Sequence, residues 1–249
     1  MCVAERLQLA LATAAAVASP ASRRRRPGLI TATLSIGTAG QPWGAAEKAE
    51  WRDSRVRHRS YADEVLSQLE PLREAGWEVV QYGELSIDPA RYPLFALRTR
   101  EWSADRPSVL LTGGVHGYET SGVQGALLWL REASAAYASK MNILVAPCVS
   151  PWGYEHIQRW NAAAVDPNRS FGPKPSEADT EEATSLMGLI RSLSVERWSC
   201  HVDLHETTDT DETEFRPAKA ARDGVEYEQD TIPDGFYTGV PFFLSICPI

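Results

Sequence analysis

Hydrophobic and polar positions along the chain fall into helix-like and strand-like patterns. Between Trp51 and Ala75, apolar residues recur at spacings of three and four, and Gly76 follows as a natural stop, so this stretch is predicted to be a helix. Short apolar or alternating runs elsewhere are typical of β-strands. The expected strands are residues 77–82, 92–98, 108–112, 141–147 and 198–204.

Two further helices are expected between these strands. Residues 121–139 carry apolar side chains on one helical face, and residues 176–193 begin with crowded acidic residues, which the helix dipole favours. Strands that alternate with helices of this length indicate an α/β fold, a mostly parallel mixed sheet with helices on both faces. Ligands bind such sheets just beyond the carboxyl ends of the strands, so we expect the chemistry in those loops.

Two histidines stand at such positions. His116 and His205 each follow the carboxyl end of an expected buried strand, and Glu119 lies three residues after His116 on a glycine-flanked turn. A catalytic zinc ion needs three ligands from His, Glu or Asp and one open position for water. A lone His-x-x-Glu pair is common by chance, but the strand-ending His205 can supply the third ligand. His116, Glu119 and His205 are therefore the candidate ligands of a Zn²⁺ ion.

His201 is the rival for the third position. It lies four residues before His205 in the same expected strand, so both side chains point to the same side of that strand. We prefer His205 because it stands at the strand end, and we interpret His201 as a partly buried residue of the sheet.

A polar run lies between the two halves of the expected metal site. It consists of Arg159–Asn161 and Val165–Phe171, and it places a carboxylate, two amides and two guanidinium groups within a short stretch. A planar guanidinium binds a carboxylate through two parallel hydrogen bonds. A positive group near a metal can also stabilise charge that appears in a transition state. The alternative for both arginines is a pair of surface salt bridges.

These motifs occur in a recognisable order. His-x-x-Glu is followed by Arg-x-Asn, then Asp-x-Asn-Arg-x-Phe, then the strand-ending histidine, over roughly Val109 to Glu206. The series resembles the zinc metallocarboxypeptidases that are similar to carboxypeptidase A, and their bacterial relatives. The resemblance implies an enzyme that releases C-terminal residues from peptides, with zinc as its cofactor and a peptide or small amide as its substrate.

The resemblance also implies roles for individual residues. His205 occupies the family position of the third zinc ligand. Asp166 corresponds to the carboxylate that orients His116, and Arg159 to the group that stabilises the developing oxyanion. Asn168 and Arg169 correspond to the pair that grips the free carboxylate of the substrate.

The chain departs from the family after His205. Members of the family use a glutamate on a late strand as general base, and no glutamate here has a convincing strand-end context. Glu226 and Glu228 fall in a polar stretch, residues 222–234, that is predicted to be a loop. We therefore expect residues 41–249 to be a partial catalytic domain, truncated at its C-terminus, and we expect the base to be absent.

Two other functions remain open. A deacylase of the aspartoacylase and succinylglutamate desuccinylase type shares the His-x-x-Glu and Asp-Leu-His elements and cleaves small N-acyl amino acids. A catalytically impaired relative that only binds zinc or peptide is the other alternative.

An acidic cluster follows His205. It consists of Glu206, Asp209, Asp211, Glu212 and Glu214. One interpretation is an acidic rim that attracts basic substrates. We favour the other, a solvated loop.

Composition narrows the class of partner. The formal net charge of -8 argues against general nucleic-acid binding, which needs a basic surface. No apolar run approaches the roughly 20 residues that a membrane helix requires, so we expect no membrane partner. The four cysteines have no paired spacing, which argues against a cysteine zinc site, and Cys148 and Cys200 are interpreted as small buried hydrophobic residues.

The first 40 residues are expected to lie outside the fold. They combine an alanine-rich apolar stretch with four arginines, Arg23 to Arg26, and contain Glu5 as their one acidic residue. Positive charge after the apolar stretch is unlike a secretory signal, and an Arg-rich, acid-poor segment suits an organelle transit peptide or a disordered extension. A cytoplasmic or organellar location is therefore favoured over secretion.

Overall fold

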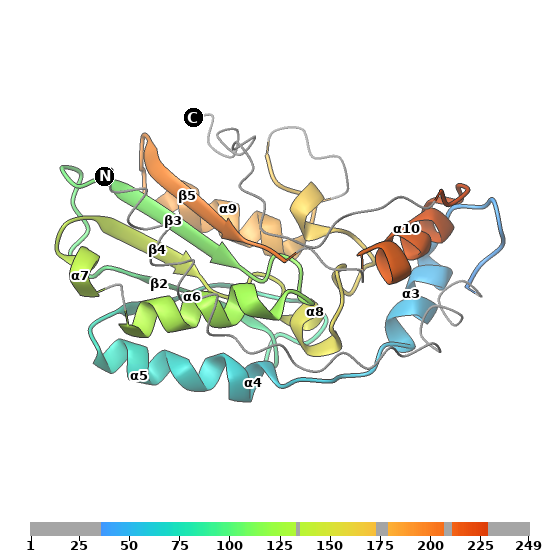
Figure 1. Ribbon diagram of the computed structural model, residues 1–249, viewed down its shortest axis with the longest axis horizontal. Helices are drawn as coiled ribbons and strands as arrows, with labels where there is room; N and C mark the ends of the chain where they lie inside the picture. Colours follow the sequence, from blue (N-terminus) through green and yellow to red (C-terminus); the bar gives the residue numbers. More distant parts are fainter. Residues whose placement is uncertain (1–35, 133–134, 173–178, 207–210, 229–249) are drawn as a thin grey trace.

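The computed structural model describes residues 36–132, 135–172, 179–206 and 211–228. A five-stranded sheet in the order β1-β2-β4-β3-β5 forms the centre of the fold (Figure 1). The strands are β1 (Glu78–Glu84), β2 (Pro93–Arg98), β3 (Ser108–Gly113), β4 (Asn142–Ala146) and β5 (Trp198–Leu204). All five coincide with the expected strands, which confirms that part of the prediction.

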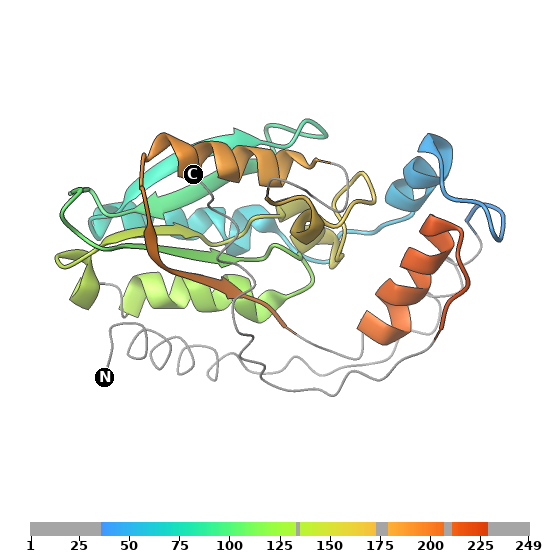
Figure 2. The same cartoon turned by 90° about the horizontal axis from the view of Figure 1, so that it is seen from above.

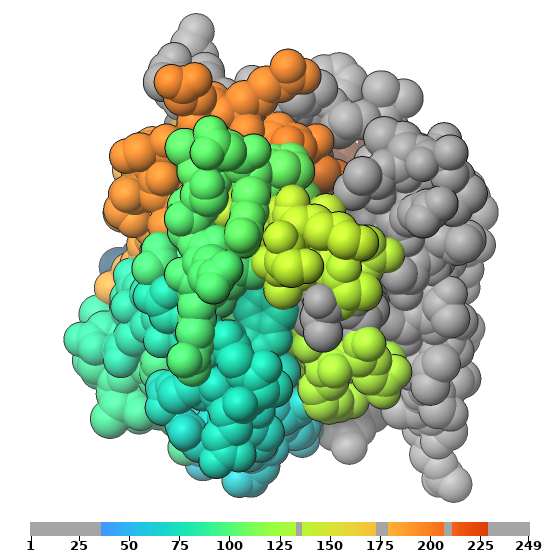
Figure 3. Space-filling view, turned by 90° about the vertical axis from the view of Figure 1, so that its left-hand side faces the viewer, coloured from blue at the N-terminus to red at the C-terminus, as the bar shows by residue number. Residues whose placement is uncertain are grey.

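The sheet is mixed but mostly parallel. β2 pairs antiparallel with β1 and with β4, whereas β3 pairs parallel with both β4 and β5. β2 alone therefore runs against the other strands, because a short connection joins it to β1 as a hairpin. The carboxyl ends of β3 and β5 lie side by side at one end of the sheet. Figure 3 views the opposite end, where the turns that lead into β3, β4 and β5 gather.

Helices cover both faces of the sheet. Alternate residues of β3 belong to two separate cores, since Val109 and Leu111 pack in one cluster and Leu110 in the other. Helices α5 (Leu69–Glu74) and α6 (Thr120–Glu132) pack on the first face. Helix α9 (Glu181–Ser192) packs on the second (Figures 1 and 2). Double coverage explains why the central strands are continuous apolar runs.

The predicted helix over residues 51–75 is wrong as one element. The chain forms α3 (Ala45–Asp53), leaves the helical path, and resumes with α4 (Tyr61–Glu64), η1 (Leu66–Gln68) and α5.

The cause of this break is a tertiary contact. The backbone N–H groups of His58 and Arg59 donate to the carbonyl of Glu155, at 2.8 and 3.2 Å. The Ser60 side chain then accepts from the Asp63 N–H and caps α4. These bonds replace the intrahelical bonds that a continuous helix would have made.

The other helical predictions hold where they can be compared. Residues 121–139 form α6 and the short α7 (Ala135–Ala138), and residues 176–193 contain α9, which begins at a Thr180 cap. Residues 173–178 lie outside the described part.

Among the residues that the structure describes, four short helices were not predicted. They are α8 (Pro151–His156), η2 (Pro167–Arg169), η3 (Asp211–Phe215) and α10 (Arg216–Asp223). Helix α10 extends into the stretch from Arg222 that was expected to be a loop, and Gly224 ends it in the left-handed conformation at φ 68°.

Helix α10 is held by aromatic packing. The Arg222 guanidinium lies over the Trp160 ring at 4.6 Å and donates to the Ala164 carbonyl at 2.9 Å, while the Arg222 carbonyl accepts from the Trp43 N–H. These contacts place α10 beside α3 (Figures 1 and 2). The pattern of charged and apolar residues in the sequence did not predict these contacts.

Other expectations meet the structure in part. Cys148 is buried, as expected, and Cys200 is half-buried against the core. Cys2, Cys247 and residues 1–35 of the expected extension lie outside the described residues. Within the described part, no helix is both long and apolar enough to cross a bilayer.

Candidate metal centre

Two neighbouring strand ends bring the candidate ligands together. β3 ends at Gly113 and leads into the turn that carries His116 and Glu119, and β5 ends one residue before His205. The turn depends on Gly117, where a Cβ atom would lie 1.9 Å from the backbone carbon of Gly153. Because β3 and β5 are adjacent and parallel, their loops meet at the same end of the sheet.

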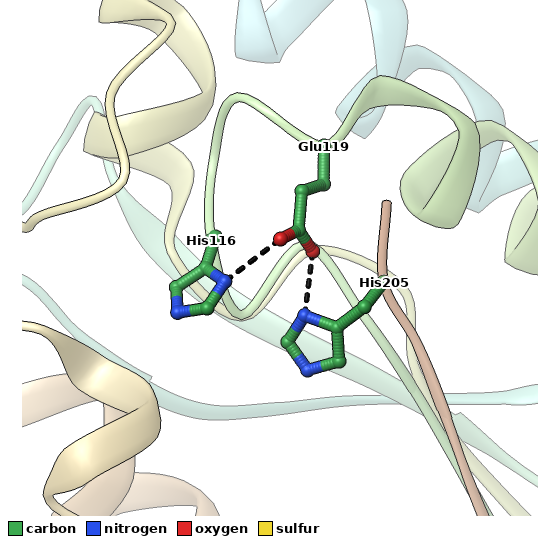
Figure 4. Close-up of side chains that lie close together, drawn as sticks. All are labelled: His116, Glu119 and His205. Atoms are coloured by element: carbon green, nitrogen blue, oxygen red, sulfur yellow. Dashed lines mark hydrogen bonds and ion pairs between the residues drawn. The ribbon is translucent and has the colours of Figure 1, made fainter. Parts of the chain in front are cut away.

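Both histidines direct the same ring nitrogen at one carboxylate (Figure 4). His116 Nδ1 lies 2.8 Å from Glu119 Oε1, and His205 Nδ1 lies 2.6 Å from Glu119 Oε2. The candidate ligand atoms of the three residues all lie within 4.8 Å of one another. This set, called the His–Glu–His group below, has the size of one coordination sphere.

The His–Glu–His group is buried on one side and open on the other. The side chains of His116 and Glu119 are each 2% exposed, whereas that of His205 is 27% exposed. A substrate or water would therefore approach past His205.

Asp166 holds the outer nitrogen of His116. His116 Nε2 lies 2.9 Å from Asp166 Oδ1, which also accepts from the Asn168 N–H, and Arg159 Nε donates to Asp166 Oδ2 at 3.0 Å. Burial alone would raise the pKa of Asp166, but the hydrogen bond from His116 and the nearby positive charges hold that pKa well below its usual range. The carboxylate is therefore ionised and accepts the His116 N–H.

Asp203 does the same for His205. His205 Nε2 lies 2.7 Å from Asp203 Oδ2, and Thr112 Oγ1 donates to Asp203 Oδ1 at 2.6 Å. None of the sequence motifs had assigned a role to Asp203. Its position two residues before His205, on the same side of a strand, was the signal that could have identified it.

These carboxylates set the charge of the group. Burial would raise the pKa of Glu119, but hydrogen bonds from His116 and His205 outweigh it and lower that pKa. Burial opposes a charge on His205, yet Asp203 and Glu119 outweigh it and raise the pKa of His205 to about 10. A metal ion must displace that proton, so metal affinity at this group depends on pH.

The residues present fit a zinc ion. Two imidazoles and one glutamate are a donor set used by catalytic zinc sites, which keep a further position for water. Each histidine already has a carboxylate behind its outer nitrogen, the arrangement that fixes the tautomer of a metal-ligating histidine. His201 is not a member of the group, because its Nε2 atom contacts Thr112 Oγ1 at 3.0 Å.

Arg159 lies beside the group in a double ion pair. Its Nε donates to Asp166, and its Nη1 donates to Asp211 Oδ1 at 3.0 Å. Tyr118 OH donates to the same oxygen at 2.9 Å. The guanidinium is thereby fixed in orientation close to His116.

The acidic cluster after His205 is not a solvated loop throughout, so that interpretation was wrong. Asp211 is half-buried in the contacts just described, and Glu206 accepts the Ser121 N–H at the start of α6. Glu212 pairs with Arg216 at 2.6 Å. Asp209 lies outside the described residues.

Asn168 and Arg169 follow Asp166 in η2. Asn168 is half-buried and lines a small cavity beside Phe171 and His201. Arg169 is exposed, and within the described ranges its guanidinium makes no hydrogen bond or ion pair. Its charge is therefore available to an anionic partner.

No carboxylate stands out as a general base in the part of the chain that the structure describes. Asp166, Asp203 and Asp211 each bind at least two partners around the group. Glu226 and Glu228 are exposed residues that follow α10.

The fold and the His–Glu–His group define an α/β protein with a candidate metal centre at the carboxyl end of its sheet. Residues 105–229 match the succinylglutamate desuccinylase/aspartoacylase catalytic domain. The match covers half of the chain, and the chain belongs to this family. Together with the relatives described below, the match supports the zinc carboxypeptidase-like family that the motifs resemble.

Curated relatives include fungal carboxypeptidases. Carboxypeptidase 2 of Trichophyton rubrum is 28% identical over 195 residues, which are 73% of this chain and 32% of the relative. Carboxypeptidase 2 of Trichophyton equinum is 33% identical over 136 residues, which are 49% of this chain and 24% of the relative. The chain thus spans about a third or less of these relatives.

Solved structures share the fold. A proposed metallopeptidase of Shewanella amazonensis SB2B is 26% identical with a TM-score of 0.50, over 57% of this chain and 54% of that chain. Another from Shewanella baltica OS155 has a TM-score of 0.51 at 24% identity, over 62% of this chain and 61% of that chain. The mixed sheet with helices on both faces is therefore common to this chain and these proteins.

Proposed function

We propose that the chain carries the metal centre of a zinc-dependent hydrolase that releases C-terminal residues from peptides. The observation that carries this proposal is the His–Glu–His group, in which both histidines direct Nδ1 at Glu119 from two adjacent strand ends. The names of the curated relatives and of the solved structures support the same class.

The metal would be held by His116, Glu119 and His205. A zinc ion bound there would polarise the scissile carbonyl and lower the pKa of its water toward ~7. Asp166 would keep the His116 imidazole in the tautomer that leaves Nδ1 free for the ion.

Two arginines would act on the substrate. Arg159 is fixed by Asp166 and Asp211, so its positive charge is preorganised beside the group and can stabilise a developing oxyanion. Arg169 is exposed and can grip a terminal carboxylate with two parallel hydrogen bonds, with Asn168 beside it.

A deacylase of small N-acyl amino acids is the second candidate. The family match over residues 105–229 favours it, and such substrates also carry a carboxylate that Arg169 could bind. The same metal centre would serve either reaction, since both cleave an amide bond.

Parallel assays separate these functions. The protein, with saturating zinc, is given a series of peptides that differ in the C-terminal residue and a series of N-acyl amino acids. Release of C-terminal residues supports the carboxypeptidase, and turnover of N-acyl amino acids alone supports the deacylase. Stoichiometric zinc without turnover on either series would leave a zinc-binding protein and contradict both activities. The His205→Ala variant is the control for contaminating hydrolases.

A further inference from the structure

A polar network continues from the His–Glu–His group back into the sheet. β3 and β5 pair in a register that sets Thr112 opposite Asp203 and Leu110 opposite His201. Thr112 Oγ1 consequently lies within hydrogen-bond distance of two side chains of β5, Asp203 Oδ1 at 2.6 Å and His201 Nε2 at 3.0 Å.

The single hydroxyl hydrogen of Thr112 decides the direction of these bonds. Asp203 Oδ1 lies 2.6 Å from Thr112 Oγ1, and a carboxylate oxygen accepts hydrogen bonds. Thr112 therefore donates to Asp203, and its oxygen can only accept from His201 Nε2–H. The network has one consistent set of donors and acceptors.

The second oxygen of Asp203 also determines which nitrogen of His205 carries a hydrogen. Asp203 Oδ2 lies 2.7 Å from His205 Nε2, so this nitrogen carries the hydrogen and Nδ1 is the atom left to face Glu119. The Asp203 side chain is only 12% exposed, so water has little access to replace Thr112 as its partner.

The network extends from the carboxyl ends of β3 and β5 to the face of the sheet that α9 covers. Thr112, His201 and Asp203 line a small cavity with Asn168, and the rest of its lining is apolar: Leu110, Val115, Phe171, Leu186 and Ile190. The apolar surroundings strengthen the hydrogen bonds within the network and make an unpaired member costly.

We propose that Asp203 is a positioning residue for His205 and that Thr112 acts through Asp203. Asp203 selects the His205 tautomer that offers Nδ1 to a metal, and the Thr112 hydroxyl holds the carboxylate in the orientation that this requires. The inference rests on the proposed metal centre, to which it adds two residues of the sheet.

The test compares zinc affinity, measured by competition with a chromophoric chelator, in four proteins: wild type, Asp203→Asn, Thr112→Val and Thr112→Ser. Loss of such a carboxylate behind a histidine ligand should weaken zinc binding roughly 10- to 100-fold. Thr112→Val removes one hydrogen bond at nearly constant volume and should weaken binding roughly 2- to 10-fold. Thr112→Ser keeps the hydroxyl and should bind as the wild type does.

A second readout reports the ring itself. In the zinc-loaded, ¹⁵N-labelled protein, the NMR signals of His205 should identify Nδ1 as the metal-bound nitrogen and Nε2 as the protonated one. In Asp203→Asn the Nε2 proton should move upfield and exchange faster with water. If Asp203→Asn does not fold, the Thr112 pair carries the test alone.

The outcomes are distinguishable. Equal zinc affinity in wild type and Asp203→Asn, or zinc on Nε2 of His205 in the wild type, overturns this inference and leaves the metal centre standing. Equal losses in Thr112→Val and Thr112→Ser overturn the part assigned to the hydroxyl. A wild-type chain that binds no zinc overturns both the inference and the proposed function.

Discussion

At the scale of single residues, the candidate centre is a set of imidazoles held between carboxylates. Glu119 lies between the Nδ1 atoms of His116 and His205, and Asp166 and Asp203 hold the two outer nitrogens. In each ring a carboxylate binds one nitrogen, and the other nitrogen points to the centre of the site. This orientation suits the binding of a cation.

We predict that His205→Ala abolishes stoichiometric zinc binding and that His201→Ala retains it. His205 belongs to the His–Glu–His group, whereas His201 bonds Thr112. Metal content of the purified variants, measured by elemental analysis after dialysis, checks this. Zinc retained by His205→Ala and lost by His201→Ala would exchange their roles.

Arg169→Lys should impair the processing of peptides with a free C-terminal carboxylate more than that of peptide amides. Lysine keeps the positive charge but lacks the two-pronged geometry, so kcat/KM for peptides with a free C-terminal carboxylate should fall roughly 10- to 100-fold. The matching peptide amides serve as the internal control and should be processed nearly as before. Equal losses on free acids and amides would remove Arg169 from the substrate site.

At the scale of elements, one buried carboxylate joins three segments. Glu155 of α8 has a fully buried side chain that accepts from the Tyr61 N–H at the start of α4, from Arg91 through two nitrogens and from the Tyr92 hydroxyl. Burial alone would raise the pKa of Glu155, but the hydrogen bonds from Arg91, Tyr61 and Tyr92 lower it. The charge is therefore retained inside the protein.

Glu155→Gln should destabilise the fold by roughly 1–3 kcal/mol, because it weakens the hydrogen bonds that Arg91, Tyr61 and Tyr92 donate to the buried carboxylate. Urea unfolding followed by circular dichroism measures the change. Glu70→Gln, which breaks the exposed ion pair with Arg73, is the matched control and should cost at most about 0.5 kcal/mol. A loss as small for Glu155→Gln as for the control would contradict this account.

At the scale of the whole molecule, stability should depend on the protonation of Glu182. This residue of α9 is 1% exposed, and its carboxylate accepts from Asn161 at 3.2 Å on the loop that carries Arg159 and Asp166. Burial raises the pKa of Glu182 from 4.5 to about 7. The folded protein therefore holds a proton that the unfolded chain releases at lower pH.

The direction of the pH dependence of stability follows from the difference between the pKa of Glu182 in the folded and in the unfolded state. Between pH of about 4.5 and about 7 the folded state binds more protons, so this group makes stability fall as pH rises, by on the order of 3 kcal/mol in total. Urea unfolding at pH 5 and pH 7.5 should show this loss in the wild type and a much smaller one in Glu182→Gln. The same pH dependence in both proteins would exclude Glu182 as its source.

The sequence by itself determined the five strands, the two helices α6 and α9 that pack on the sheet, and the order of the motifs. Burial on both faces makes the central strands continuous apolar runs, and this local pattern can be read without coordinates. The position of His116 and His205 after two such strands also follows, because a parallel sheet brings its carboxyl ends together. Their shared contact with Glu119 agrees with that expectation.

Only the tertiary structure decided the other contacts between distant residues around the site. The pairing of Thr112 with Asp203 depends on the register of β3 against β5, and the contact of Arg159 with Asp211 depends on where η3 packs. The break before α4 likewise comes from Glu155, far along the chain. Hydrophobic periodicity reports whether a position is buried, but a hydrogen bond between remote side chains depends on packing that no local pattern encodes.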